Sequence, residues 1–184
     1  MMFSLCDGMG CGAEASRESR RIVELLETLL ETGFAPRSAF KLVNTVLLLA
    51  GGEQHPAALD AGCIDLYTGA LEIFKLGAPG AFVMGQEGIQ VLEGRQVPAG
   101  ALEQAEPVLL SRKLWDGDRL IMVTDGVLDA LPGDDKEQVM GQFLDSLEEM
   151  PPQDMAEHVL DFALSFVPGA RDDMTVLAVQ VWKK

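Results

Sequence analysis

Aspartates stand beside glycines or other turn residues at three points where a short apolar run ends or begins. Asp7 ends the first run and leads into a glycine-rich stretch, and Asp125 ends a second run much later in the chain. Asp172 and Asp173 come just before a third run. Mg²⁺ and Mn²⁺ prefer carboxylate, carbonyl and water oxygens as ligands. These corners therefore predict a site for hard divalent cations if the fold brings them together.

The composition indicates an ordered domain of ordinary size and narrows its partners. The chain has 184 residues, of which 48% are hydrophobic, and a formal net charge of −15. This acidity argues against nucleic acid and anionic membrane as partners, since both favour basic surfaces. Three cysteines without a C-x-x-C pair indicate neither a disulfide framework nor a zinc ribbon. We expect a single cytoplasmic domain over residues 1–184 that makes no membrane contact.

Two helices are expected directly after the first acidic corner. Apolar residues recur at helical spacing from Ala13 to Thr32, and Gly33 is a suitable C-cap. Pro36 suits the first turn of a second helix, which should end at Ala50 before two glycines. The short connection predicts an antiparallel helix pair.

The rest of the chain is typical of short antiparallel strands followed by a second pair of helices. The expected strands cover residues 59–66, 70–76, 81–84 and 89–92, then a hairpin of 108–114 and 119–124, and a last strand at 175–182. The second helix pair is expected at residues 136–150 and 154–166. Helices in pairs with strands in blocks favour an α+β fold, which we interpret as an α-β-β-α sandwich of two antiparallel sheets.

The acidic corners also resemble the motifs of a known family. DGMG at residues 7–10, TDG at 124–126 and DDMTVL at 172–177 are similar to those of the metal-dependent protein serine/threonine phosphatases, the PPM type. Met9 stands where eukaryotic members have histidine, so the bacterial branch fits better, above all the C-terminal phosphatase domain of stage II sporulation protein E. All motifs occur in order, and the resemblance covers essentially the whole chain.

This resemblance implies two Mn²⁺ or Mg²⁺ ions at one end of the two sheets. The residue matching Asp7 would bridge both ions, and the backbone carbonyl matching Gly8 would support one of them. The residues matching Asp125 and Asp172 would hold the other ion, with Asp173 ranked second because many members have asparagine there. Asp7, Asp125 and Asp172 would be the catalytic residues, and a metal-activated water would attack phosphorus without a covalent phosphoenzyme.

The resemblance also implies a biological setting. The substrate would be a phosphoserine or phosphothreonine on a regulatory protein of the anti-sigma-factor antagonist type. Full-length relatives are tethered to the membrane with this domain in the cytoplasm, and a movement of the helix after the first corner is thought to switch them. Relatives also have a further N-terminal strand pair with a metal-supporting acid. With those N-terminal strands missing here, an exposed strand edge would favour a homodimer.

Other interpretations stay open beside this one. A catalytically incomplete regulatory or interaction module could keep the same fold without turnover. Residues 8–13 match the dinucleotide fingerprint G-x-G-x-x-A, although a second helix follows where a parallel strand should be. The cysteines and His55 match no zinc spacing, so buried or half-buried free thiols are expected. His55 and His158 are conceivable proton donors, but nothing in the sequence orients either, and a surface role is expected.

Overall fold

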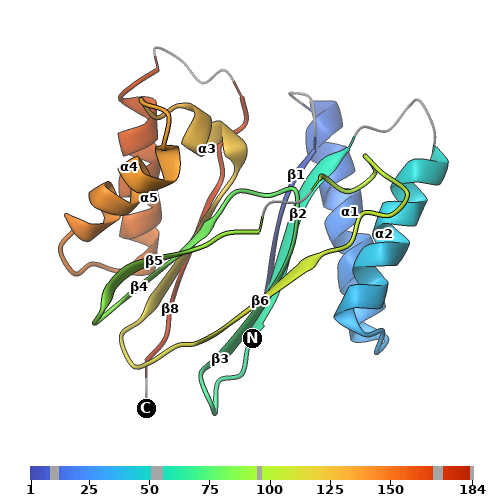
Figure 1. Cartoon of the computed structure of the whole chain (residues 1–184), viewed down its shortest axis with the longest axis horizontal. Coiled ribbons are helices and arrows are strands. Elements are labelled where there is room, and N and C mark those ends of the chain that lie inside the picture. Colours follow the sequence, from blue (N-terminus) through green and yellow to red (C-terminus); the bar gives the residue numbers. More distant parts are fainter. Residues whose placement is uncertain (9–12, 51–55, 95–96, 168–171, 183–184) are drawn as a thin grey trace. The chain divides into compact units, whose positions relative to one another are not determined.

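The computed structural model describes residues 1–8, 13–50, 56–94, 97–167 and 172–182. The chain divides into two compact units, each built on its own four-stranded sheet (Figure 1). The first unit comprises Met1–Ile64, Leu71–Ala78 and Gly94–Ser111, and the second comprises Asp65–Ala70, Pro79–Glu93 and Arg112–Lys184.

The first unit is an antiparallel sheet of order β1-β2-β3-β6 with two helices on one face. Its elements are β1 (Met2–Gly8), α1 (Ala13–Glu31), α2 (Pro36–Ala50), β2 (Ala57–Ile64), β3 (Ala70–Leu76) and β6 (Val108–Lys113). Leu26 of α1 and Phe40 of α2 are fully buried in one apolar cluster with Leu59 and Leu76 of the sheet. This cluster fixes which face of β1, β2 and β3 the helices cover.

The end of α1 shows why a glycine is needed there. Gly33 has φ of 91°, in the left-handed region that side chains rarely adopt. The N–H of Phe34 donates to the Leu29 carbonyl and the N–H of Gly33 to the Leu30 carbonyl, both at 3.0 Å. These two bonds form a Schellman motif, so the expected C-cap at Gly33 is confirmed.

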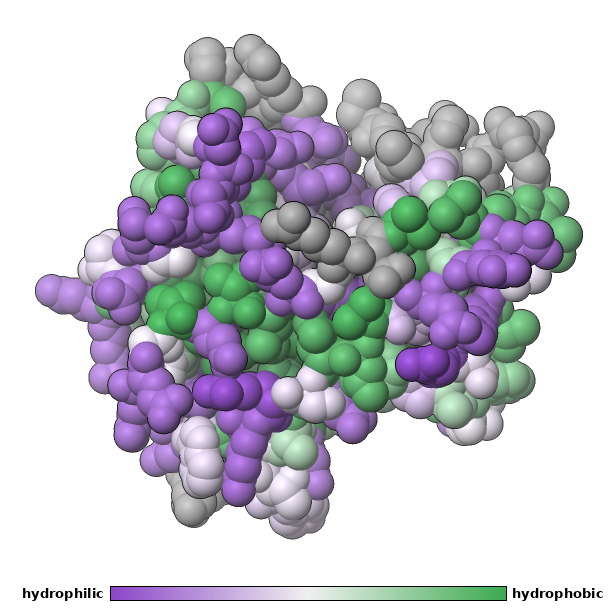
Figure 2. All heavy atoms as spheres, in the orientation of Figure 1, coloured by the Kyte–Doolittle hydropathy of each residue, from purple (hydrophilic) through white to green (hydrophobic). Residues whose placement is uncertain are grey.

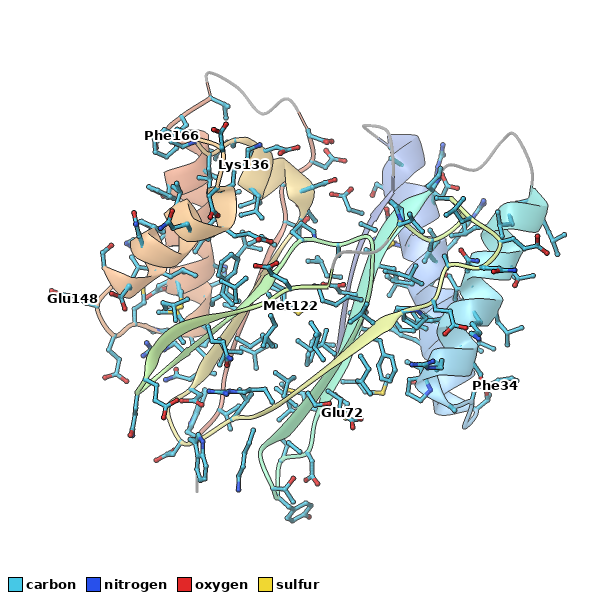
Figure 3. All side chains as sticks on the ribbon, in the orientation of Figure 1. Phe34, Glu72, Met122, Lys136, Glu148 and Phe166 are labelled. Carbon is cyan, nitrogen blue, oxygen red and sulfur yellow. The ribbon has the colours of Figure 1, made fainter. Side chains whose placement is uncertain are left out.

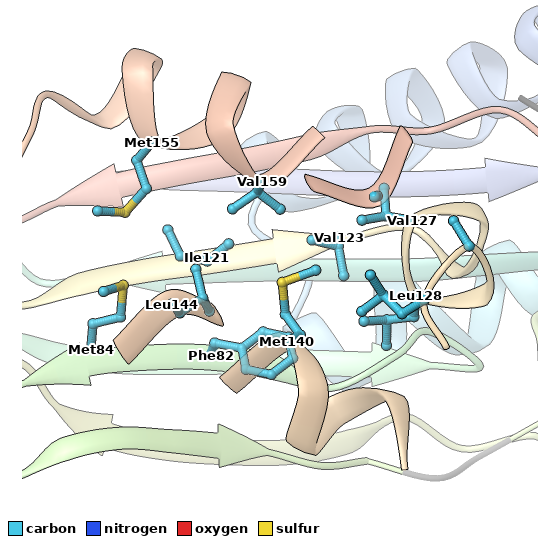
Figure 4. Close-up of a cluster of buried hydrophobic side chains, with 13 residues drawn as sticks. Phe82, Met84, Ile121, Val123, Val127, Leu128, Met140, Leu144, Met155 and Val159 are labelled. Carbon is cyan, nitrogen blue, oxygen red and sulfur yellow. The ribbon is translucent and has the colours of Figure 1, made fainter. Parts of the chain in front are cut away.

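The second unit is an antiparallel sheet of order β5-β4-β7-β8 with its own helices. Its elements are β4 (Ala81–Gly85), β5 (Gly88–Leu92), β7 (Arg119–Val123), α3 (Asp125–Asp129), α4 (Lys136–Asp145), α5 (Pro152–Leu164) and β8 (Val176–Gln180). Met140 of α4 and Val159 of α5 are fully buried with Phe82 and Ile121 of the sheet (Figure 4).

The expected α+β fold, with two antiparallel sheets that each carry a pair of helices, is confirmed. The helix expected at residues 136–150 is shorter, because α4 ends at Asp145. There the N–H of Leu147 donates to the Leu144 carbonyl at 3.2 Å, an i to i−3 bond that tightens and closes the last turn. The short helix α3, directly after β7, was not expected.

The expected hairpin of residues 108–114 and 119–124 is wrong, because β6 and β7 belong to different sheets. Four of the five residues of β7 are buried, whereas β6 alternates between half-buried and exposed residues. A strand buried on both faces belongs in the middle of a sheet, and β7 lies between β4 and β8. The turn after residues 70–76 likewise leads into a different sheet.

Candidate metal centre

Asp125 and the Asp172–Asp173 pair lie at the same end of one strand pair in the second unit. β7 and β8 run antiparallel with Val123 opposite Val176, so the residue after β7 and the residues before β8 are neighbours. A Cβ at Gly126 would lie 2.5 Å from the Asp173 carbonyl oxygen and 3.3 Å from the Asp172 Cβ. The close approach requires glycine at this position, and it brings these acids to one corner.

Thr124 joins the two sides of this corner, and sequence reasoning did not single it out. Its N–H donates to the Thr175 carbonyl at 3.1 Å, and its Oγ1 accepts from the Thr175 N–H at 3.0 Å. The same hydroxyl donates to the Asp173 carbonyl at 3.3 Å. Thr124 is buried, so these bonds hold the segment before β8 against the end of β7. A threonine directly before Asp125 at a strand end was the available signal.

The side chains of this corner fit a hard divalent cation by their chemistry. Asp125, Asp172 and Asp173 are exposed and offer only oxygen atoms, which is the donor type of Mg²⁺ and Mn²⁺. Asp125 Oδ1 accepts from the Gly126 N–H at 3.0 Å, and Asp172 Oδ1 accepts from the Asp173 N–H at 2.8 Å. In each carboxylate these bonds orient one oxygen.

The helix that follows Asp125 is held by a salt bridge at its other end. Lys136, at the start of α4 (Figure 3), pairs with the carboxylate of Asp129, the last residue of α3. Val127 and Leu128 of α3 are buried in the apolar cluster of the second unit. The backbone that carries Asp125 is therefore fixed by packing as well as by strand pairing.

The first acidic corner lies at the end of β1, which includes both Asp7 and Gly8. The Gly8 N–H donates to Ser19 Oγ of α1 at 2.9 Å, and a Cβ at Gly8 would lie 3.0 Å from the same atom. Helix α1 therefore contacts the corner directly. Ser19 was not expected to contribute, because a serine within a helical pattern gives no local signal of such a contact.

Cys6, directly before Asp7, is not a candidate nucleophile. Burial raises the pKa of its thiol to about 12, and the neighbouring Asp7 carboxylate acts in the same direction. A thiol with so high a pKa carries almost no thiolate at neutral pH. Cys6 and Cys63 are both free; Cys6 is half-buried as expected, whereas Cys63 is exposed, which contradicts that expectation. Cys11 lies outside the described residues.

The structure describes all five expected metal-site residues but divides them between the two units. Asp7 and Gly8 belong to the first unit and the other three acids to the second, so their meeting at one site stays a prediction. Within the described parts of the chain, no three His, Cys, Asp or Glu residues form a group that could hold a metal. His158 is exposed on α5, where its Nδ1 lies 2.8 Å from the Asp154 carbonyl oxygen. His55 and residues 9–12 are outside the described ranges.

A pocket of about 550 Å³ lies in the second unit, and it is not at the acidic corner. It is lined by the β4–β5 hairpin together with Arg112, Trp115 and Asp118. Asp118 precedes β7, whereas Asp125 follows that strand. The pocket is thus at the opposite end of β7 from the candidate ligands.

Comparison with known proteins adds to this geometry. The family model of stage II sporulation protein E (SpoIIE) matches residues 1–182. The chain belongs to this family. It is 28% identical over 180 residues to stage II sporulation protein E of Bacillus subtilis (strain 168), covering 97% of this chain and 22% of that protein. The protein of the same name from Priestia megaterium is 27% identical over 181 residues, covering 97% of this chain and 31% of the relative.

Solved structures show the same fold. The structure of the PP2C phosphatase domain of SpoIIE from Bacillus subtilis with a fragment of its regulatory domain matches with a TM-score of 0.88 and 28% identity, covering 98% of this chain and 54% of that one. The RsbU and RsbW domains of Rv1364c from Mycobacterium tuberculosis match in fold, with a TM-score of 0.84, 20% identity, and coverage of 100% and 52%. The chain is therefore homologous to PP2C-type serine/threonine phosphatase domains of the SpoIIE family.

Two further expectations can be compared with the structure. The dinucleotide interpretation required a parallel sheet after the glycines, but β1 pairs antiparallel with β2 and two helices intervene. Among the described residues, no helix is both long and apolar enough to cross a membrane. On the face drawn in Figure 2, hydrophilic side chains cover much of the surface, in line with the net charge of −15.

Proposed function

We propose that this chain is a phosphatase domain that uses Mn²⁺ or Mg²⁺ to hydrolyse phosphoserine or phosphothreonine on a regulatory protein. The observation that carries the proposal is the oxygen-only corner formed by Asp125, Asp172 and Asp173 at the ends of β7 and β8. Membership of the SpoIIE family supports the same chemistry. One homologous structure is of a phosphatase domain presoaked with Mn.

The chain's own residues have separate roles in this proposal. Asp125 and Asp172 would hold one ion, with Asp173 as a further oxygen donor, while Asp7 and the Gly8 carbonyl would hold a second. Bound Mn²⁺ or Mg²⁺ would supply a water of lowered pKa and neutralise charge on the phosphoryl oxygens. Thr124 and Ser19 keep the two corners in position through their hydrogen bonds. No side-chain nucleophile is required.

The substrate that we propose is a phosphorylated anti-sigma-factor antagonist in the cytoplasm. Membership of the SpoIIE family supports this class of regulatory protein. The chain spans 22% and 31% of the lengths of its two curated relatives, so substrate and partners of the longer proteins are carried over here as proposals. The acidity of the chain disfavours nucleic acid as a partner.

A second candidate function is a regulatory or interaction module that keeps the fold without turnover. One observation favours it: within the part of the chain that the structure describes, no three acids form a group that could hold a metal. The two candidates differ in a simple assay. The phosphatase hydrolyses a chromogenic phosphate ester only when Mn²⁺ is present, whereas the module does not hydrolyse it under any condition.

The decisive experiment compares charge-removing variants in that assay. Asp7→Asn and Asp125→Asn should each lower the Mn²⁺-dependent rate about a hundredfold or more, because a lost ligand removes several kcal/mol of transition-state stabilisation. Asp161→Asn, at an exposed position of α5, is the matched control and should keep the full rate. Wild-type activity that survives both active-site substitutions would refute the metal roles, and a wild-type chain without activity would favour the module.

A further inference from the structure

A buried ion pair lies within the sheet of the first unit, and the proposed mechanism does not use it. Lys75 of β3 is directly opposite Asp60 of β2, and its Nζ donates to Asp60 Oδ2. The side chains are 0% and 2% exposed. The other oxygen of this carboxylate, Asp60 Oδ1, is buried and receives no hydrogen bond from the residues that the structure describes.

Stability alone does not account for this pair. Two charges removed from water lose their hydration, and apolar residues of similar volume are often at least as stabilising as a buried ion pair. Burial raises the pKa of Asp60 to about 6, although the Lys75 ammonium opposes this shift. The carboxylate is therefore incompletely compensated, with one oxygen unsatisfied. Such a pair calls for a role beyond packing.

The strand register places Asp60 beside Asp7. Leu59 packs against the helices, so the alternation of a strand turns Asp60 to the other face of the sheet. Asp60 is opposite Leu5, and Ala58 is opposite Asp7, so Asp7 shares this face with Asp60. Such diagonal neighbours lie about 7–8 Å apart in an antiparallel pair.

The same register shows that few charges share this face. On the described strands β1, β2, β3 and β6, Asp7 and Asp60 are the acidic residues of the face, since Glu72 of β3 alternates to the opposite side. Without Asp60, Asp7 would be the remaining carboxylate on this face of the described strands. A buried ammonium without a counter-charge is strongly disfavoured, so it either loses its proton or pairs with another anion.

We propose that Asp60 is a positioning residue for the metal site: it binds the Lys75 ammonium and so keeps that cation from competing with a divalent ion for Asp7. The inference rests on the proposed function, through the role of Asp7 as a metal ligand. The pair is neutral as a unit, so it adds no net charge near Asp7. Lys75 in turn prevents the Asp60 carboxylate from repelling that of Asp7.

The test is the binding of Mn²⁺ alone to the whole chain, measured by titration calorimetry at pH 7.5. Asp60→Asn leaves the ammonium unpaired and should weaken Mn²⁺ binding about tenfold or more, because a buried like charge acts through a low dielectric. The double variant Asp60→Asn/Lys75→Met removes both charges and should bind within about threefold of wild type. Glu72→Gln, on the other face of β3 (Figure 3), is the matched control and should bind as wild type does.

This pattern separates positioning from a structural role. If the pair only stabilised the fold, the double variant would bind no better than Asp60→Asn, and losses in affinity would follow losses in the urea midpoint of unfolding. Either result would overturn the inference. If Asp60→Asn does not fold, the double variant still decides, since a folded double variant with tenfold weaker Mn²⁺ binding contradicts the proposal.

A failure of the proposed function gives a different result. Asp7→Asn should abolish binding of the Mn²⁺ ion that Asp7 holds, in the wild-type and in the double-variant background. Unchanged binding in Asp7→Asn would show that Asp7 is not a ligand, which refutes the proposed function itself. Loss of binding in Asp7→Asn together with unchanged binding in Asp60→Asn refutes the present inference alone.

Discussion

The two acidic corners are held in place by different kinds of structure. In the second unit, Thr124 connects the ends of the neighbouring strands β7 and β8 directly, so the spacing of Asp125 and Asp172 follows from strand pairing. In the first unit, Asp7 is the next-to-last residue of β1, and the N–H of Gly8, the last residue, donates to Ser19 of α1. The second corner is therefore held by a strand pair and by the short helix α3 that begins at Asp125, whereas the first depends on how the long helix α1 packs.

This difference indicates where regulation would act. A tilt of α1 would pull on the Gly8 backbone through its bond to Ser19 and would shift Asp7 with it. The hydrogen bonds described for the corner at Asp125 link Thr124 to Asp173 and Thr175, all within the second unit. We therefore expect the affinity for a bridging ion, more than the geometry of the second corner, to respond to anything that moves α1.

The largest expected effect is that of a methyl group at Gly126. The added Cβ would lie 2.5 Å from the Asp173 carbonyl oxygen, which is backbone and cannot swing aside. We expect Gly126→Ala to lower the free energy of unfolding by about 1–3 kcal/mol, as overpacking does. Since the displaced segment carries Asp172 and Asp173, the Mn²⁺-dependent rate should fall about a hundredfold.

Gly141 provides the matched control for this substitution. A Cβ there would meet only Ile89 Cγ2, at 3.8 Å, within an ordinary helix interior. Gly141→Ala should raise the free energy of unfolding by about 0.5–1 kcal/mol and leave the rate unchanged. Urea unfolding and the chromogenic assay measure both variants. An active and stable Gly126→Ala would show that the second corner is looser than its hydrogen bonds indicate.

The next expected effect is a pH dependence of the free energy of unfolding that arises from Asp60 in the first unit. Its pKa is raised by burial from the ordinary value of 3.8 to about 6. Between these values the folded chain holds the proton more tightly than the unfolded chain, so this group makes the free energy of unfolding rise as pH falls from about 6 to 4. As pH falls over this range, the free energy of unfolding of wild type should rise by on the order of 2 kcal/mol relative to that of Asp60→Asn/Lys75→Met.

Urea unfolding of both proteins at pH 4.5 and pH 7.5 tests this expectation. The two proteins differ only at residues 60 and 75, so contributions from the rest of the chain cancel in the difference. A difference that does not change with pH, or one that favours wild type at the higher pH, would show that the Lys75 ammonium outweighs burial. The folded Asp60 would then titrate near or below its ordinary pKa.

Sequence reasoning found the acids of both corners because each stands at a strand end beside a motif, and strand ends are local features. It missed Ser19 because the bond to Gly8 depends on the direction in which α1 leaves the corner. It also missed the Asp60–Lys75 pair, although the hairpin turn at Asp65–Ala70 fixes the register that sets the two side chains opposite. A charged residue in each of two apolar strands was the available signal.

The assignment of strands to sheets was less predictable than the strands themselves. Turn residues between 114 and 119 suggest a hairpin locally, yet β6 and β7 belong to different sheets. β7 is buried on both faces, and this burial is what separates it from β6. The apolar sequence of β7 indicates the burial, but the strands that pair with it are distant along the chain. Pairings of this kind depend on the whole fold, so a local turn signal cannot predict them.

The smallest expected effects come from the two hydroxyl groups that hold the corners, and they test the comparison directly. Ser19→Ala removes one hydrogen bond to the Gly8 N–H and should lower the free energy of unfolding by about 1 kcal/mol. Thr124→Val removes two bonds and should lower it by about 1–2 kcal/mol, although the Thr124 N–H keeps its bond to the Thr175 carbonyl.

If the first corner depends on α1, Ser19→Ala should weaken Mn²⁺ binding more than Thr124→Val does, despite its smaller effect on stability. Excess Mn²⁺ should then restore the rate of Ser19→Ala. Calorimetry ranks the two variants by Mn²⁺ affinity, and urea unfolding ranks them by stability. If the two rankings agree, both corners are held equally firmly.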